Sequence, residues 1–199
     1  MDYNISKKNW DTIIGYAQTA YDIHKAEIGG MSVMVEGEDS WTLHDPVILK
    51  QEVSTGNCVL DKEALAMYYA TAGEKWKKYN FRFCWWHSHH TMKAFWSGTD
   101  LTAIEEFSEG DISFALVVNL KEEYEFRVSV WKPLEVHQDV ELNIGERLVN
   151  QAMIDEVNTL TTKPNIVYKW GKTGSTYKHN LHNEMTLWNN SFGILDDPI

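Results

Sequence analysis

The sequence has few cysteines and no sign of a disulfide framework. Its 199 residues include only two cysteines, Cys58 and Cys84, which stand far apart and outside any CxxC pair. This spacing excludes a cystine-stabilised secreted scaffold and a structural zinc site made of thiolates. The first ten residues also lack the apolar run of a secretory signal. We therefore expect a protein of the reducing cytoplasm.

The sequence also lacks an excess of basic residues and any long apolar run. It has 18 Lys and Arg against 29 Asp and Glu, which gives a formal net charge of -11. An acidic chain repels nucleic-acid backbones and anionic lipid, so nucleic acid is not an expected partner. No window approaches the roughly 20 apolar residues that cross a bilayer, so no membrane association is expected.

The residues that are present suffice for a sizeable core. The chain is 43% hydrophobic and 13% aromatic, and no internal repeat or low-complexity tract interrupts it. The periodic elements occupy residues 1–143, which we expect to form one catalytic domain. Residues 144–199 are predicted to form a C-terminal helix over 145–160 and then a polar extension, whose scattered aromatics Trp170, Tyr177 and Trp188 could dock a substrate or a second copy.

The first half of the sequence predicts two helices and three strands. Ser6 can cap a helix whose apolar residues recur at three- and four-residue spacing, and the glycines that follow would end it. Residues 31–35 and 41–49 read as a hairpin. Asp61 can cap a second helix, and the aromatic stretch at 81–87 reads as a strand that ends at a histidine.

The second half predicts one short helix and three further strands before the C-terminal helix. Thr99 can cap a short helix that Gly110 would stop. Residues 111–119 form a continuous apolar run, which is typical of a strand buried on both faces, and 124–131 alternate in polarity beside it. Residues 135–144 are expected to form a single final strand. The predicted class is α/β or α+β, with one mixed sheet flanked by helices.

Three residues near the end of the 81–87 strand have the character of zinc ligands. His87 and His89 are separated by one residue, so both imidazoles project to the same side of an extended segment. Asp100 follows at the start of the next helix and adds an oxygen ligand. Three protein ligands with an open fourth position are typical of catalytic zinc, whereas structural zinc usually has four ligands. The pattern predicts one Zn²⁺ per chain.

A hydrolytic zinc site also needs a proton acceptor and a group that stabilises negative charge. Ser97 lies three residues before Asp100, so its hydroxyl could donate to a developing oxyanion. Glu27 precedes two glycines that allow close backbone approach, and it is the best candidate for the general base. Glu36 is the alternative.

Several neighbouring residues have two possible roles. His90 should face away from a metal held by its neighbours, which makes it a candidate substrate contact. Trp96 either packs the loop or forms a wall for an extended substrate tail held by strand pairing. Trp85 and Trp86 are expected in the core and at its rim rather than in a binding platform. Cys84 is expected to be buried.

The spacing of these residues resembles a known motif. His87 and His89, then seven residues, Ser97, two residues and Asp100, with Glu27 upstream, are similar to the JAMM motif of the MPN metalloprotease family. The resemblance extends over roughly residues 10 to 143. It includes the stretch QEVSTGNCVLDKEAL before the motif, and FALVVN and FRVSVW after it.

The resemblance implies a fold, a site and an activity. The expected fold is the JAB/MPN fold, a mixed sheet between helices that resembles a cytidine deaminase core. His87, His89 and Asp100 would bind zinc, Glu27 would activate the zinc water as general base, and Ser97 would stabilise the tetrahedral intermediate. The expected activity is that of a metallopeptidase or deubiquitinase-like isopeptidase. Its substrate would be a protein or peptide, such as a ubiquitin-like conjugate.

The sequence is also compatible with other functions. The sequence has no cysteine-bearing insertion between Asp100 and the strand at 111, which favours a prokaryotic or phage-type enzyme over a specialist for polyubiquitin linkages. A non-catalytic binding or scaffold module of the same fold is one alternative. A small-molecule zinc amidohydrolase or deaminase is another, although the sequence lacks the PCxxC pair of zinc deaminases.

Overall fold

The computed structural model describes residues 1–108, 110–146 and 159–161. The predicted helix over 145–160 lies almost entirely outside these residues. The predicted extension, with Trp170, Tyr177 and Trp188, lies wholly outside them. The division of the chain near residue 143 therefore stays a prediction.

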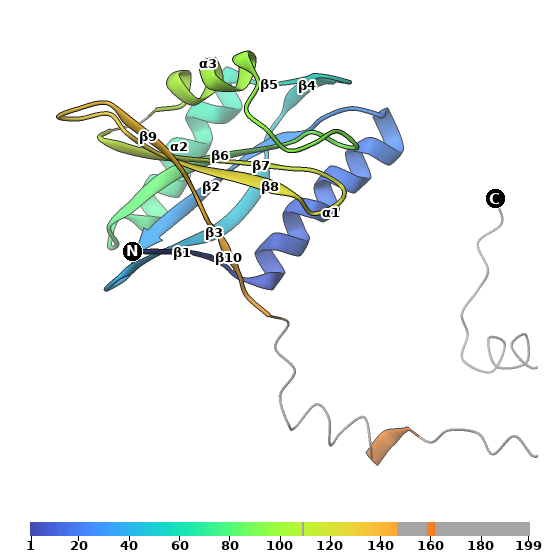
Figure 1. Cartoon of the computed structure of the whole chain (residues 1–199), viewed down its shortest axis with the longest axis horizontal. Coiled ribbons are helices and arrows are strands. Elements are labelled where there is room, and N and C mark those ends of the chain that lie inside the picture. The colour runs from blue at the N-terminus through green and yellow to red at the C-terminus, as the bar shows by residue number, and fades with distance from the viewer. Residues whose placement is uncertain (109, 147–158, 162–199) are drawn as a thin grey trace, which may run out of the picture. The chain divides into compact units, whose positions relative to one another are not determined.

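Eight strands form one mixed sheet in the order β10-β1-β3-β2-β6-β7-β8-β9 (Figure 1). In chain order they are β1 (Asp2–Ile5), β2 (Gly29–Glu36), β3 (Ser40–Ile48), β6 (Phe81–Ser88), β7 (Ile112–Val118), β8 (Tyr124–Val130), β9 (Val136–Val140) and β10 (Asn143–Ile144). Strand β1 is parallel to β3 and β10, and β6 is parallel to β7, whereas the other neighbouring strands are antiparallel. Two more strands, β4 (Gln51–Ser54) and β5 (Asn57–Leu60), form a separate antiparallel hairpin. The predicted class, a mixed sheet flanked by helices, is confirmed.

The first helix, α1 (Lys7–His24), begins as its sequence predicts. The hydroxyl of Ser6 accepts a hydrogen bond from the Asn9 amide, which satisfies one of the free N–H groups of the first turn. The helix ends at His24 with Lys25 in the left-handed region, at φ 52°. The expectation that the following glycines end the helix is wrong, because both lie in β2.

Those glycines are required by a close crossing of strands. A Cβ atom on Gly30 would lie 2.1 Å from the carbonyl oxygen of Val47 and 2.6 Å from the ring of Trp86. A Cβ atom on Gly29 would lie 2.8 Å from Sγ of Cys58. Only glycine allows β2 to pass between these neighbours, so the predicted close backbone approach is confirmed.

Two further helices pack on the sheet. Helix α2 (Lys62–Trp76) has Asp61 as its N-cap, as predicted. Helix α3 (Gly98–Glu106) begins two residues earlier than predicted, because Ser97 rather than Thr99 is its N-cap. It ends at Glu106, well before Gly110. None of the helices within the described residues is long and apolar enough to cross a membrane.

The stretch expected to be one final strand is in fact two strands at opposite edges of the sheet. Residues Val136–Val140 pair with β8 as β9, whereas Asn143 and Ile144 pair with β1 as β10. Only residues 141 and 142 separate the two strands, so the sheet must curl until its edges approach each other. Hydrogen bonds between the Tyr124 hydroxyl and the backbone of Leu142 hold the crossing segment. The alternating polarity predicts an extended chain here, but it does not predict that the two parts of this stretch pair with different strands.

The helices cover different faces of the sheet. On one face, Trp10 and Ile13 of α1 pack with Cys84 and Trp86 in a core in which each of these side chains is fully buried. On the other face, a second core contains Met31, Leu60, Trp85, Ile104 and Ala115, with side chains of α2 packed against it. The alternation along β6 therefore divides its aromatic run between two cores. The predicted burial of Cys84, Trp85 and Trp86 is confirmed.

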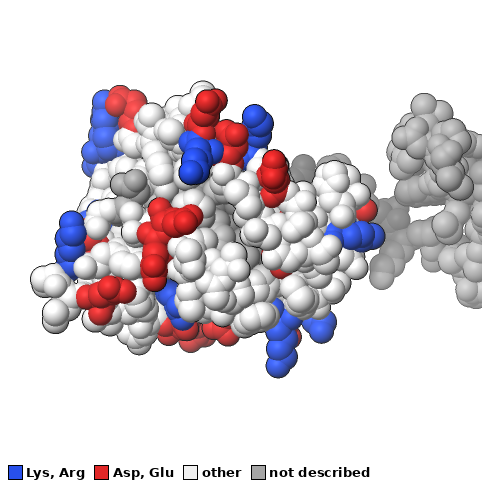
Figure 2. Space-filling model, turned by 90° about the horizontal axis from the view of Figure 1, so that it is seen from above, with Lys and Arg blue, Asp and Glu red and all other residues white. Residues whose placement is uncertain are grey.

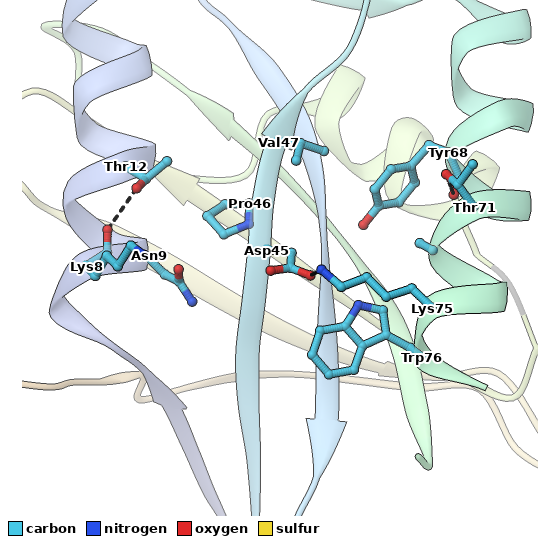
Figure 3. A pocket seen from close by; sticks show the side chains of 11 residues that line it. Lys8, Asn9, Thr12, Asp45, Pro46, Val47, Tyr68, Thr71, Lys75 and Trp76 are labelled. Atoms are coloured by element: carbon cyan, nitrogen blue, oxygen red, sulfur yellow. Dashed lines mark hydrogen bonds and ion pairs between the residues drawn. The ribbon is translucent and has the colours of Figure 1, made fainter. Parts of the chain in front are cut away.

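A cavity of about 460 Å³ lies beside the edge of β3, between α1 and α2 (Figure 3). Strand β1 pairs with β3 only as far as Leu43, whose carbonyl then accepts a hydrogen bond from the Asn9 side chain. Beyond this point Asp45 has a left-handed backbone, Pro46 has no N–H to donate, and Lys75 forms an ion pair with Asp45. Proline, irregular backbone and charge are features that block pairing with another strand. This edge is therefore poorly suited to bind an extended peptide.

Candidate metal centre

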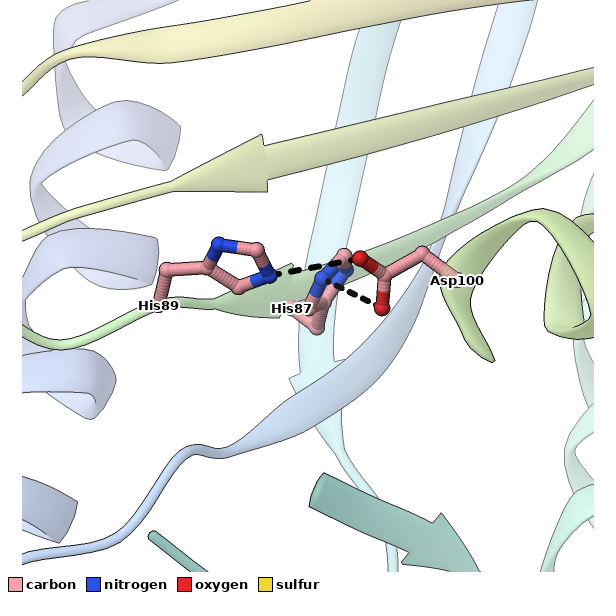
Figure 4. Close-up of side chains that lie close together, drawn as sticks. All are labelled: His87, His89 and Asp100. Carbon is pink, nitrogen blue, oxygen red and sulfur yellow. Dashed lines mark ion pairs between the residues drawn. The ribbon is translucent and has the colours of Figure 1, made fainter. Parts of the chain in front are cut away.

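The three predicted metal ligands converge at one end of the sheet (Figure 4). His87 Nε2 lies 3.1 Å from Asp100 Oδ1, and His89 Nε2 lies 3.3 Å from Asp100 Oδ2. One possible ligand atom from each residue lies within 4.8 Å of the others. The exposed fractions of the three residues are 1%, 3% and 7%. A buried cluster of two imidazoles and one carboxylate could hold a metal ion.

The backbone around the two histidines is fixed by neighbouring strands. His87 lies opposite Gly29 in β2 and opposite Val117 in β7. The His89 amide donates to the Val118 carbonyl at 2.8 Å, one residue past the end of β6. The chain therefore stays extended through both histidines, which is why their rings lie on the same side. Their ring centroids are 5.0 Å apart.

Asp100 is oriented by the first turn of α3. The Ser97 amide donates to Asp100 Oδ2 at 2.7 Å, and the Asp100 amide donates to the Ser97 hydroxyl at 3.2 Å. This reciprocal arrangement is a capping box, in which a short acidic side chain replaces the usual Glu or Gln. It fixes the carboxylate at the helix N-terminus, where the helix dipole also favours negative charge.

The histidines have the contacts expected of metal ligands. His89 Nδ1 lies 3.1 Å from the Lys93 carbonyl, an acceptor only, so this nitrogen carries the proton and leaves the Nε2 lone pair available. The His87 ring stacks on Trp85, with centroids 4.4 Å apart. Both nitrogens of His87 are buried; Nε2 lies 3.1 Å from Asp100 Oδ1 without the geometry of a hydrogen bond, and Nδ1 has no hydrogen-bond partner among the described residues. Buried polar atoms without a partner are rare, and a metal ion would satisfy one of them.

The charges within the cluster reinforce one another. Burial alone would raise the pKa of Asp100, but its contacts with His87 and His89 outweigh burial and hold the pKa well below its usual range. Burial lowers the pKa of His87, so its ring is neutral. Burial also acts to lower the pKa of His89, but the Asp100 carboxylate and the Lys93 carbonyl outweigh it and raise that pKa. An ionised carboxylate and a neutral imidazole are the forms in which these groups bind metal, so Asp100 and His87 are in the binding form, whereas the raised pKa of His89 opposes metal binding until its extra proton is released.

Glu27 lies beside this cluster, and Glu36 does not. Glu27 precedes β2 by two residues, next to the point where Gly29 pairs with His87. Its exposed fraction is 4%. Burial raises its pKa to about 7, the positive charge of His89 acts to lower it, and the Asp100 carboxylate raises it further. Glu36 is exposed at the opposite end of β2, about 23 Å along the strand, so the alternative base is excluded by distance.

Ser97 lies next to the cluster, in contact with Asp100. The hydroxyl oxygen accepts the Asp100 N–H, and a side-chain hydrogen bond from Ser97 helps to lower the pKa of the Asp100 carboxyl group. The O–H can rotate about its C–O bond and could turn to another acceptor. The residue is half-buried. The predicted donor role is therefore compatible with the capping role that the sequence did not reveal.

His90 and Trp96, the two predicted substrate contacts, both contact other parts of the protein. His90 is outside the ligand group, as expected. Its Nε2 lies 2.8 Å from the Thr55 carbonyl, and its ring stacks on Tyr21. The Trp96 Nε1–H donates to Asp139 of β9 at 3.1 Å. Their roles toward a substrate stay predictions.

Cys58 is the residue near the site that the sequence did not indicate. Burial raises the pKa of its thiol to about 12, with further contributions from the negative charges of Glu27 and Asp100. The stretch QEVSTGNCVLDKEAL precedes the motif, but no local pattern shows that it forms a hairpin of β4 and β5 that folds against the metal cluster. Hence Cys58 could not be placed from sequence.

A second cavity, of about 770 Å³, lies next to the cluster between β5, α2 and α3. Cys58 and Gly98 are among the residues that line it, so it reaches the beginning of α3 close to Ser97. None of the three candidate ligands is among the residues that line it. Figure 2 shows that acidic and basic side chains are intermixed on the face drawn there and do not form a continuous basic area.

No family model and no curated protein matches the chain. Among solved structures, the chain is similar to the solution structure of protein DSY2949 from Desulfitobacterium hafniense. The two are 17% identical, the match covers 73% of this chain and 94% of that chain, and the TM-score is 0.49. A similarity at this level identifies neither a family nor a function for this chain.

Proposed function

We propose that the chain is a zinc-dependent hydrolase that cleaves peptide or isopeptide bonds, a metallopeptidase of the JAMM type. The observation that carries this proposal is the convergence of His87, His89 and Asp100 in a buried cluster with Glu27 beside it. Four residues from three separate parts of the sequence meet at one point, in the order and spacing of the JAMM motif. Two nitrogen ligands and one oxygen ligand with no cysteine suit a catalytic zinc ion.

The ligand set suits zinc, and the residues around it suit amide hydrolysis. When bound, the ion would act as a Lewis acid and lower the pKa of a water molecule to about 7. Glu27, with its own pKa at about 7, can take a proton from the attacking water at neutral pH. The same carboxyl group can then deliver that proton to the leaving amine nitrogen. The carbon–nitrogen bond breaks, and no other proton carrier is required.

Ser97 would act on the carbonyl oxygen of the scissile bond. Its hydroxyl oxygen is held by the Asp100 amide, and its O–H would turn from the Asp100 carboxyl group to the carbonyl oxygen. Negative charge develops on that oxygen when water adds to the carbonyl carbon. A positioned donor of this kind typically contributes about 10²-fold or more to the rate.

The cavity beside α3 supports a substrate with an extended chain. Strand β5 lines this cavity and pairs only with β4 among the described strands. An extended peptide could therefore pair along its other edge and bring its terminal amide bond to the cluster. A flexible tail of a ubiquitin-like protein, joined to an amine, has this form.

The experiment is a hydrolysis assay with zinc-loaded protein on fluorogenic peptides and on isopeptide-linked ubiquitin-like conjugates. We expect cleavage by the wild type, abolition by chelators with recovery on adding zinc, and a loss of at least about 10²-fold in Glu27→Gln. Glu36→Gln is the matched control, because Glu36 lies at the far end of β2, the strand that Glu27 precedes, and is distant from the cluster. Equal activity of the Glu27→Gln protein would refute the proposal. Zinc binding without cleavage of any conjugate would favour a binding module.

A further inference from the structure

Trp96 connects the metal cluster to the outer strands of the sheet. It directly precedes Ser97, and its ring centroid lies 6.1 Å from that of His87. On its other side its Nε1–H donates to Asp139 Oδ1 at 3.1 Å. Trp96 therefore touches a candidate metal ligand and a carboxylate of β9, two strands beyond β7.

Asp139 is itself held by Arg127. The two residues lie directly opposite each other in β8 and β9. Arg127 donates from Nε to Asp139 Oδ1 at 2.7 Å and from a terminal nitrogen to Oδ2 at 2.9 Å. The Arg127 guanidinium also lies 5.2 Å from the centroid of the Trp96 ring. We call Trp96, Arg127 and Asp139 the indole clamp.

Strand register explains why the indole clamp forms on the side of the metal cluster. Trp85, Ala115, Arg127 and Asp139 lie opposite one another in β6, β7, β8 and β9, so all four side chains project from the same face. Trp96 packs against the core that contains Trp85 and Ala115. The small side chain of Ala115 separates Trp85 from Arg127, which leaves space for an indole ring above this row.

The clamp can act on the metal cluster through one short covalent path. The residue after Trp96 is Ser97, whose amide donates to Asp100 Oδ2 at 2.7 Å. A change in the position of Trp96 moves this amide and thereby the carboxylate that faces both histidines. Groups that orient metal ligands through hydrogen bonds typically change metal affinity by about 10- to 100-fold.

We propose that Arg127 and Asp139 are positioning residues for the metal centre, and that they act by fixing Trp96 and, through it, the capping box of Ser97 and Asp100. The inference rests on the proposed function in that it takes the cluster to be a metal site. An ion pair at the protein surface contributes little to stability by itself. This pair has a second role, because both of its members also contact Trp96, the residue before Ser97.

The chain offers a matched control for an ion pair of the same type. Arg82 of β6 donates from Nε to Asp111 at 3.1 Å, and Asp111 is more exposed than Asp139. Arg82 precedes His87 by five residues, about 17 Å along the strand. Asp111→Ala therefore removes an arginine–aspartate pair from the same protein without changing any contact of Trp96 or of the metal cluster that is described above.

The experiment measures zinc affinity by competition with a chromophoric chelator, together with the visible absorption spectrum of the Co²⁺-loaded protein. The variants are Asp139→Ala, Trp96→Phe and Asp111→Ala, all in the full chain. We expect Asp139→Ala to weaken zinc binding about 10-fold and to change the Co²⁺ spectrum. Trp96→Phe, which keeps an aromatic ring but loses the N–H donor, should change both in the same direction. Asp111→Ala should leave both unchanged.

Thermal unfolding of the metal-free variants separates positioning from stability. The positioning role is supported if zinc affinity falls in Asp139→Ala but not in Asp111→Ala, while the melting temperatures of these two variants are similar. Wild-type affinity and spectrum in Asp139→Ala would overturn it, as would equal weakening in Asp111→Ala. A wild type that binds neither Zn²⁺ nor Co²⁺ would instead overturn the proposed function on which this inference rests.

Discussion

Glu27 should destabilise the metal-free protein at neutral pH, and Glu27→Gln should therefore make that protein more stable. Burial raises the pKa of Glu27 from its ordinary value of 4.5 to about 7. Below pH 4.5 the carboxyl group is protonated in both the folded and the unfolded protein, so it adds no pH dependence. As the pH rises toward 7, the unfolded protein loses this proton more readily, and the free energy of unfolding falls.

The size of the effect follows from the two pKa values. One pKa unit corresponds to about 1.4 kcal/mol, so the difference between the two pKa values of Glu27 lowers the free energy of unfolding by about 3 kcal/mol at most above pH 7. Solvent around the carboxyl group reduces this figure, and we expect about 2 kcal/mol. For a protein of this length that is an increase of roughly 4–8 °C in melting temperature. A carboxylate retained at such a cost is typical of a functional site.

The assay is urea unfolding of wild type and Glu27→Gln at pH 4 and pH 8, with chelator present. We expect equal stability at pH 4 and greater stability of Glu27→Gln at pH 8. Glu36→Gln is the control, because that side chain is exposed, and it should change stability by less than about 0.5 kcal/mol. A wild type as stable as Glu27→Gln at pH 8 would show that Glu27 is not held in a desolvated position beside the cluster.

Three further changes test the packing, the cap and the thiols. Gly30→Ala should lower the free energy of unfolding in urea by about 3 kcal/mol or more, because its Cβ would clash with the Val47 carbonyl. The control Gly15→Ala, in open space on α1, should raise that free energy by up to about 1 kcal/mol. Equal effects of the two substitutions would contradict the close crossing of β2. Ser97→Ala should lower the free energy of unfolding by about 1 kcal/mol and weaken zinc binding. Unchanged zinc affinity would show that the capping box does not orient Asp100. Burial raises the pKa of Cys58 and of Cys84 to about 12, so Cys84, which is fully buried, should not be alkylated at pH 8 until the protein is denatured, and half-buried Cys58 should react more slowly than a free thiol. Rapid labelling of Cys84 in the native protein would refute its burial.

Local patterns predict most of the sheet and the ligand group. The alternation through His87 and His89 already places both rings on one side, because the side-chain period of a strand does not depend on its neighbours. The caps at Ser6 and Asp61 follow from short polar side chains before periodic apolar residues. These features depend on contacts within a few residues, so the sequence is sufficient to predict them.

The remaining features depend on contacts between distant segments. Ser97 rather than Thr99 caps α3 because the reciprocal bonds with Asp100 favour that register, and both serine and threonine are good caps by composition. The division of residues 135–144 between two sheet edges depends on how far the sheet curls. The position of Cys58 and the clamp between Trp96 and Asp139 likewise depend on tertiary packing, which no local periodicity contains.

The most direct test of the central claim is the metal content of the purified protein after loading with zinc, measured by mass spectrometry for the wild type, Asp100→Ala and Glu27→Gln. The account predicts one zinc per chain in the wild type and in Glu27→Gln, and none in Asp100→Ala, because it proposes Asp100 as a ligand and Glu27 as the base. A wild type without zinc, or an Asp100→Ala protein that retains it, would contradict the assignment of His87, His89 and Asp100 as the metal site.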